Sequence, residues 1–188
     1  MGVEAVVAKD RAEEAGFDAL KLSEIEIQSM IELVPLEGDG VGLAVYATYG
    51  ESLVDGQDES ALAFGPLIKA ARGPRSVTLN LFAVRMFDIK EIEDGETARF
   101  PDHWNLEYAW QLKHQAIGVL AFSIEGYGDF FDVNGDLEGE HPERHRLGPV
   151  VYPTLGEGPE IEFSLGVLFG LTGATSDLAL KWGAELAF

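Results

Sequence analysis

Cysteine is absent from this chain, so disulfides and thiolate metal sites are excluded. Basic residues are also scarce, with 13 Lys and Arg against 33 Asp and Glu and a formal net charge of −20. We therefore expect no nucleic-acid ligand and no direct attraction to an anionic lipid surface. No window approaches the ~18–20 consecutive apolar residues of a transmembrane helix.

A signal peptide is missing from the start of the numbering as well. Met1 is followed by Gly2, Val3 and Glu4, without a basic region or an apolar stretch. If the protein is exported, the expectation is that this numbering begins after a removed signal or inside a longer precursor.

Alternation with a period of two residues is the pattern that recurs along the chain. In segment 177–188, every second residue from Leu178 to Phe188 is apolar, and the residues between them are polar or small. A strand places alternate side chains on opposite faces, so such a segment has one apolar and one polar face. The same alternation occurs in 24–33, 104–113 and 160–171, whereas its phase is ambiguous in 117–127 and 145–155.

The expected fold is therefore all-β: a single domain, 1–188, forming a transmembrane antiparallel up-and-down β-barrel of about ten strands. It is alternatively the larger part of a twelve-stranded barrel. The expected strands are residues 2–9, 24–33, 41–49, 61–70, 76–87, 104–113, 117–127, 145–155, 160–171 and 177–188.

The connections between these strands alternate in length. If Phe188 is periplasmic, the short turns 35–40, 71–75, 114–116 and 156–159 lie on the periplasmic side. The connections 50–60, 88–103, 128–144 and 172–176 then lie outside. Short turns at one end and longer loops at the other are typical of outer-membrane barrels.

Side-chain size favours a membrane barrel over a soluble lipocalin-like barrel or sandwich, the alternative that also alternates. The polar face combines Gly, Ala and Ser with charged residues, as a narrow interior would, while the other face is bulky for whole strand lengths. Aromatic residues stand where membrane girdles would lie: Tyr49, Trp104, Tyr108, Trp110 and Trp182. The residues expected to face lipid are Leu106, Trp110, Phe163, Leu165, Phe169, Leu180 and Trp182.

The terminal strand also predicts handling by the barrel-assembly machinery. It ends on an aromatic residue, with apolar residues at every second position before it, and the expected signal residues are Trp182, Leu186 and Phe188. The expected location is thus the bacterial outer membrane, with lipid and lipopolysaccharide as partners and a monomer favoured.

Several short motifs resemble a family of uncharacterised outer-membrane barrel proteins of Gram-negative bacteria. They are Tyr108-Ala109-Trp110-Gln111-Leu112, His145-Arg146-Leu147-Gly148-Pro149-Val150, Leu165-Gly166-Val167-Leu168-Phe169-Gly170-Leu171-Thr172, Phe64-Gly65-Pro66-Leu67 and Leu79-Asn80-Leu81-Phe82. The resemblance implies the location and the fold, with a further N-terminal strand pair in many members. It implies no substrate.

An acidic lumen is the main candidate for function. The expected lumen-facing residues are Glu24, Glu26, Glu32, Asn80, Glu107, Lys113, Glu160, Glu162, Lys181 and Glu185, with Glu125 a further acidic candidate. A ring of carboxylates favours cations in a pore, which predicts a passive, porin-like, cation-favouring channel for small solutes. The alternative is a plugged barrel, filled by ion pairs and water, with a structural or surface-interaction role.

A weak calcium motif occurs in loop 129–144. Asp132, Asn134, Asp136 and Glu143 have the spacing of oxygen ligands at loop positions 1, 3, 5 and 12. However, Leu137 replaces the glycine that the sharp turn requires. Apart from this site, no cofactor is expected.

Enzymatic activity is a further class that the sequence does not favour. Some barrels of this size are lipases with a Ser/His/Asn site, but none of His103, His114, His141 and His145 has a recognisable nucleophile motif nearby. We expect His145 to be a residue at a strand end or at the rim.

Overall fold

The computed structural model describes residues 2–4, 24–52, 57–93, 96–99, 101–135, 143–155 and 160–187. Across these ranges the protein is all-β, as expected, and none of their residues lies in a helix. Consistently, no helix in this described part is long and apolar enough to cross a membrane.

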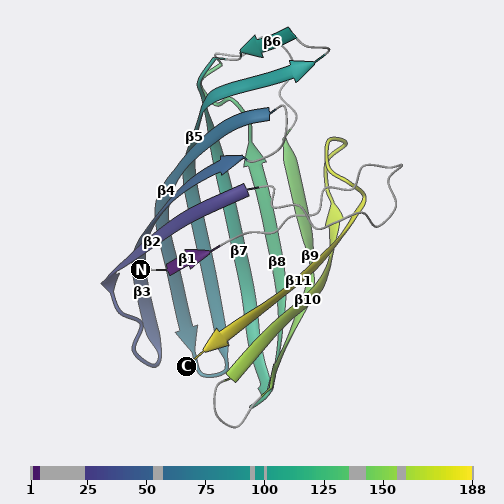
Figure 1. Cartoon of the computed structure of the whole chain (residues 1–188). Helices are drawn as coiled ribbons and strands as arrows, with labels where there is room; N and C mark the ends of the chain where they lie inside the picture. The colour runs from purple at the N-terminus through teal and green to yellow at the C-terminus, as the bar shows by residue number, and fades with distance from the viewer. Residues whose placement is uncertain are drawn as a thin grey trace.

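One antiparallel sheet contains every described strand (Figure 1). The strands are β1 (Gly2–Glu4), β2 (Glu24–Val34), β3 (Gly40–Ser52), β4 (Gln57–Arg72), β5 (Arg75–Glu93), β6 (Glu96–Arg99), β7 (His103–Ile117), β8 (Leu120–Phe130), β9 (Arg144–Leu155), β10 (Glu160–Gly170) and β11 (Leu178–Ala187).

The strands follow one another in chain order, from β1 to β5 and then from β7 to β11, while β6 pairs only with β5. The nine long strands, β2–β5 and β7–β11, form a continuous up-and-down sheet, and the three-residue β1 pairs with β2 at its edge. Within the described residues no pairing joins β11 to β1 or β2, so this part of the chain is an open, curved sheet rather than a closed barrel.

Two connections differ from their predicted form. The turn between β7 and β8 is at Gly118–Val119, not at 114–116, because the polar residues before it continue the strand and pair with β8. The expected loop 88–103 is largely a hairpin, in which β5 continues to Glu93 and pairs with β6. The strands of this hairpin were not predicted, because its acidic composition resembles that of a loop.

The predicted tight turn at Gly73-Pro74 is confirmed. Gly73 has a φ of +54°, a left-handed conformation that glycine adopts without strain. Its backbone N–H donates to Asp39 Oδ1 at 2.6 Å, which ties this turn to the neighbouring β2–β3 connection. Of the expected first strand, 2–9, only Gly2–Glu4 lies within the described residues.

Cross-strand register separates the two faces of the sheet, because directly opposed residues of antiparallel strands share a face. Glu125 of β8 lies opposite Gln111 of β7, which lies opposite Thr78 of β5. On the same face, Lys181 of β11 contacts Glu125, although three inter-strand spacings, ~14 Å on a flat sheet, separate their strands. We therefore call this the concave face and the opposite one the convex face.

The convex face is apolar and exposed from one edge of the sheet to the other. Trp182 is 79% exposed and Leu180 76%, and large apolar side chains on every long strand are exposed with them. Representative residues are Ile31, Val45, Phe64, Val77, Leu112, Ile124, Leu155 and Leu165. A soluble monomer seldom exposes a contiguous apolar surface of this extent.

The two strands with ambiguous phase are β8 and β9, and the structure assigns their faces. In β8, Ser123 and Glu125 are buried on the concave side, whereas Phe122 and Ile124 are exposed on the convex side. Gly126 and Gly128 lie on the convex face and interrupt the alternation of apolar residues in the sequence of β8. Aromatic rings from β7 lie against both glycines. A Cβ at Gly126 would clash with the Trp110 indole, and one at Gly128 with the Tyr108 ring.

Candidate functional site

A buried carboxylate, Glu125, is the centre of the polar network on the concave face. Its side chain is 1% exposed. Its Oε1 atom accepts hydrogen bonds from Gln111 Nε2 and Ser123 Oγ, both at 2.9 Å, and from the Tyr152 hydroxyl. These donors belong to β7, β8 and β9, so one carboxylate links three adjacent strands.

The other oxygen of Glu125, Oε2, contacts the cation that compensates the charge of the carboxylate. Lys181 Nζ lies 2.5 Å from Oε2, and the Tyr127 hydroxyl donates to the same oxygen. Lys181 lies on β11, so its reach to β8 crosses the concave surface. A buried charge of this kind is tolerated only when it is paired and fully hydrogen-bonded, as it is here.

A second ion pair lies beside the first. Lys113 Nζ of β7 lies 3.0 Å from both carboxylate oxygens of Glu162 on β10. The same ammonium group is 4.0 Å from the centre of the Tyr152 ring. Tyr152 therefore connects the two pairs, because its hydroxyl binds Glu125 while its ring contacts Lys113. Together the two lysines neutralise the two glutamates within one connected network.

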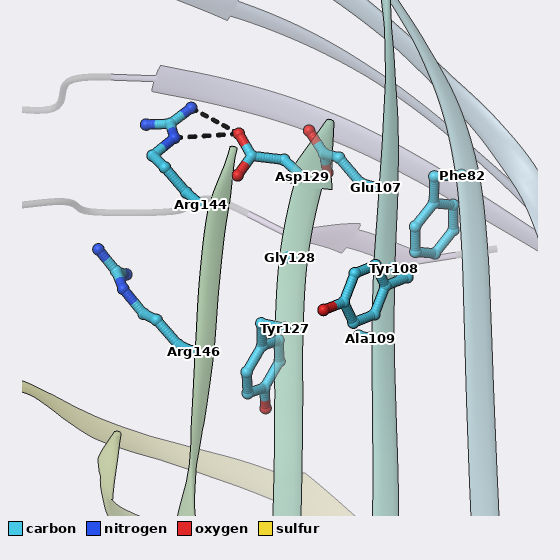
Figure 2. A pocket seen from close by; sticks show the side chains of 9 residues that line it. All are labelled: Phe82, Glu107, Tyr108, Ala109, Tyr127, Gly128, Asp129, Arg144 and Arg146. Carbon is cyan, nitrogen blue, oxygen red and sulfur yellow. Dashed lines mark hydrogen bonds and ion pairs between the residues drawn. The ribbon is translucent and has the colours of Figure 1, made fainter. Parts of the chain in front are cut away.

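A recess lies further along the same strands, toward the end of β8 (Figure 2). It has a volume of about 270 Å³ and is lined by Phe82, Glu107, Ala109, Tyr127 and Asp129 together with two arginines from β9. Arg144 binds Asp129 through Nε at 3.0 Å and Nη2 at 2.7 Å. The second arginine, Arg146, lies one step further along the concave face.

The register places six of the predicted lumen residues on the concave face, namely Glu32, Asn80, Glu107, Lys113, Glu162 and Lys181. Glu32 lies opposite Ala44 of β3, Asn80 opposite Ala109 of β7, and Glu162 opposite Glu185 of β11. The side chains of the other four, Glu24, Glu26, Glu160 and Glu185, lie outside the described part of the structure. The structure brings Lys113 together with Glu162, and Lys181 together with Glu125.

Several residues of the network were not predicted from the sequence. Gln111, Tyr127, Tyr152, Arg144 and Arg146 all contribute to the concave surface. A usable signal was present in β8, where Ser123, Glu125, Tyr127 and Asp129 recur at every second position. The alternation was not recognised, because glycines rather than apolar side chains stand at convex positions between these residues.

Two of the predicted calcium ligands, Asn134 and Glu143, make other contacts through their side-chain oxygens; Glu143 Oε2 lies 3.4 Å from His145 Nε2. Asn134 Oδ1 accepts from the Trp104 backbone N–H at 2.7 Å, and the Asp132 backbone N–H donates to Asn105 Oδ1 at 2.8 Å. Asp136 lies outside the described residues. No group of three or more His, Asp or Glu residues suited to a metal occurs in the described part, and calcium binding stays a prediction.

His145 is the second residue of β9, which confirms its predicted place at a strand end. Its Nδ1 lies 3.0 Å from the Tyr108 hydroxyl, and its ring packs against Tyr108 and Phe130 on the convex face. The expected lipid-facing residues also lie on this face; Leu165 and Phe169 are each 50% exposed, and Trp110 and Phe163 are partly exposed.

Comparisons of the chain with protein-family models, with characterised proteins and with solved structures give no match. The family resemblance inferred from the short motifs therefore stays a prediction, and the functional argument depends on the two faces of the sheet.

Proposed function

We propose that the chain is a membrane-embedded β-barrel of the bacterial outer membrane, closed between its edge strands. The exposed apolar convex face carries this proposal. Lipid would cover that face, and the backbone of a spanning sheet is satisfied in lipid only when the sheet closes on itself. Lipopolysaccharide and the barrel-assembly machinery are the partners that such a location implies.

We further propose that the barrel is plugged and has a structural or surface-interaction role. The two ion pairs support this reading because they cross the concave face between β7 and β11, where a pore would run. Carboxylates bound to lysines add little net field for attracting cations. Narrow barrels are commonly filled by side chains in this way.

A passive, cation-favouring channel is the second candidate. The net charge of −20 favours cations near the protein. The half of the concave face on β3 and β4 is also lined by small residues, including Gly42, Ala44, Ala61 and Ala63.

Planar-bilayer conductance separates the two candidates. The folded chain is reconstituted into vesicles, its insertion is checked by flotation, and the vesicles are fused with the bilayer. The plugged barrel predicts no stable conductance. Stable, cation-selective steps in a salt gradient would establish the channel instead, and anion selectivity would contradict both proposals.

If cation-selective steps occur, Glu107→Gln combined with Glu162→Gln is the next variant. Removing these carboxylates should weaken the cation preference more at low salt than at high salt, because salt screens fixed charges. Unchanged selectivity would mean that these two groups do not set the field of the pore.

A further inference from the structure

The recess of Figure 2 has apolar walls and two arginines, Arg144 and Arg146, of which only Arg144 is bound to an acid. Both arginines extend from β9, and the dashed contacts join only Arg144 to Asp129. The Nε atom of Arg146 is buried and has no hydrogen-bond partner among the described residues. A guanidinium donor buried without an acceptor is costly. Because this Nε atom is inaccessible, a ligand in the recess would meet the outer nitrogens of the guanidinium group. Arg146 lines the recess and, unlike Arg144, has no carboxylate partner among the described residues.

A second buried atom without a partner lies on the same cross-strand row. Asn80, Ala109, Tyr127 and Arg146 are successive register partners on β5, β7, β8 and β9. At the far end of this row, Asn80 Oδ1 is buried and also lacks a partner among the described residues. Between the two ends, Ala109 is the smallest side chain of the row, so its position is the hollow of the recess.

The walls beside Ala109 are aromatic. Tyr127 is its register partner, and Phe82 lies on the neighbouring strand, where its ring packs edge-on against Tyr46 at 5.4 Å. Apolar walls with one or two convergent polar groups are typical of small-molecule sites. The volume of about 270 Å³ is at the small end of such sites, which limits the ligand to a few more atoms than one ring.

We propose that this recess binds a small carboxylate with a flat apolar body, the carboxylate on Arg146 and the body over Ala109 between Phe82 and Tyr127. The guanidinium fork matches the geometry of a carboxylate. Two acid groups line the recess: Asp129 is held by Arg144, and Glu107 is the register partner of Asp129, one row away from the row that contains Arg146. The proposal goes beyond the plugged barrel, since it assigns a ligand to a part of the concave face outside the two lysine pairs.

Titration of 4-fluorobenzoate, followed by ¹⁹F NMR, tests the site on the folded chain in zwitterionic micelles, with empty micelles as the blank. The wild type should give a saturable shift. Arg146→Gln should weaken binding about tenfold or more, because a charge-assisted hydrogen bond is lost. Ala109→Leu should abolish binding by filling the hollow while it leaves every charge in place.

The matched control is Arg85→Gln. Arg85 lies on the convex face and pairs with Asp102 at 2.9 Å, so its removal changes the same charge at a distance from the recess and should leave binding unchanged. Neutral 4-fluorobenzamide should bind more weakly than 4-fluorobenzoate. Acetate, added as a competitor, should displace 4-fluorobenzoate only at concentrations at least about tenfold above those of unlabelled benzoate, because it lacks the ring.

The absence of a saturable shift with wild-type protein would overturn the proposal, as would unchanged binding in Arg146→Gln or in Ala109→Leu. Acetate that competes as well as benzoate would show attraction by charge alone and would likewise overturn it. None of these results bears on conductance or insertion, so failure of this site and failure of the membrane proposal remain distinguishable.

Discussion

Glu125 shows how a single residue constrains the concave face. Its carboxylate is nearly inaccessible to solvent, and donors from four strands converge on it. Because desolvation of a carboxylate is expensive, its net effect on stability depends on every donor being in place. Lys181 is the donor that carries the compensating charge, and it reaches Glu125 from β11.

Lys181→Met should destabilise the fold strongly, by about 3 kcal/mol and up to ~5 kcal/mol, because it leaves a buried carboxylate without its charge partner. The measurement is equilibrium unfolding in guanidinium chloride, with the chain in detergent or lipid. Glu125→Gln in the same chain should recover part of the loss, which a double-mutant cycle would quantify.

The matched control for this prediction is Lys113→Met. Its partner Glu162 is 36% exposed, compared with 1% for Glu125, so water can solvate the carboxylate that remains. The loss of stability should therefore be clearly smaller. Equal losses in the two variants would mean that burial of Glu125 does not decide the energetics.

The faces of individual residues were predictable, but their partners were not. Alternation alone placed Lys113, Glu162 and Lys181 on the polar face, because a strand fixes which side each residue occupies. That Lys181 contacts Glu125 depends on the curvature of the sheet and on the relative stagger of four strands. No local pattern in the sequence encodes either quantity.

At the scale of the strand, β11 is the simplest test of the lipid-facing assignment. Leu178, Leu180 and Trp182 lie on its convex face and are all exposed. Leu180→Arg should reduce the free energy of unfolding from a bilayer by about 1–2 kcal/mol, because Leu180 is the third residue of β11 and lies between the interface and the bilayer midplane, where a charge costs ~2–4 kcal/mol. Urea or guanidinium unfolding from thin lipid vesicles measures this loss.

Leu178→Arg is the control on the same strand and face. Leu178 is the first residue of β11, and the cost of a charge falls to about 0–1 kcal/mol near the membrane interface. A similar loss at both positions, or no loss at Leu180, would contradict the assignment of this face to lipid.

Element boundaries were less predictable than element type. The regular alternation in β10 and β11 gave both strands to within one or two residues. The turn at Gly118–Val119 was missed because polar residues just before it resembled a turn. The β5–β6 hairpin was not predicted from the sequence. Backbone hydrogen bonds hold its two strands together, and such pairing does not require the apolar face by which the other strands were recognised.

At the scale of the whole molecule, the three tryptophans report on the same surface. The register places Trp104, Trp110 and Trp182 on the convex face. Lipids brominated in the middle of the acyl chain should therefore quench the fluorescence of the reconstituted protein. In single-tryptophan variants, Trp110 should be quenched more than Trp104, because Trp104 is the second residue of β7 whereas Trp110 lies within the strand.

Tryptophan fluorescence in vesicles without bromine gives the reference intensity for each variant. Aqueous acrylamide should quench the reconstituted protein less than the denatured chain. Efficient quenching by acrylamide together with none by brominated lipid would place the convex face in water and contradict the membrane proposal.

The order of the strands has a consequence for how the protein folds. Every long strand pairs with its neighbours along the chain, so each ladder closes only a short loop and costs little chain entropy. Such local contacts allow the sheet to grow one hairpin at a time. During this growth, each intermediate has two edges with unpaired N–H and C=O groups, which lipid cannot satisfy. If the sheet closes in the membrane as proposed, it therefore needs a temporary edge partner there until its first and last strands meet.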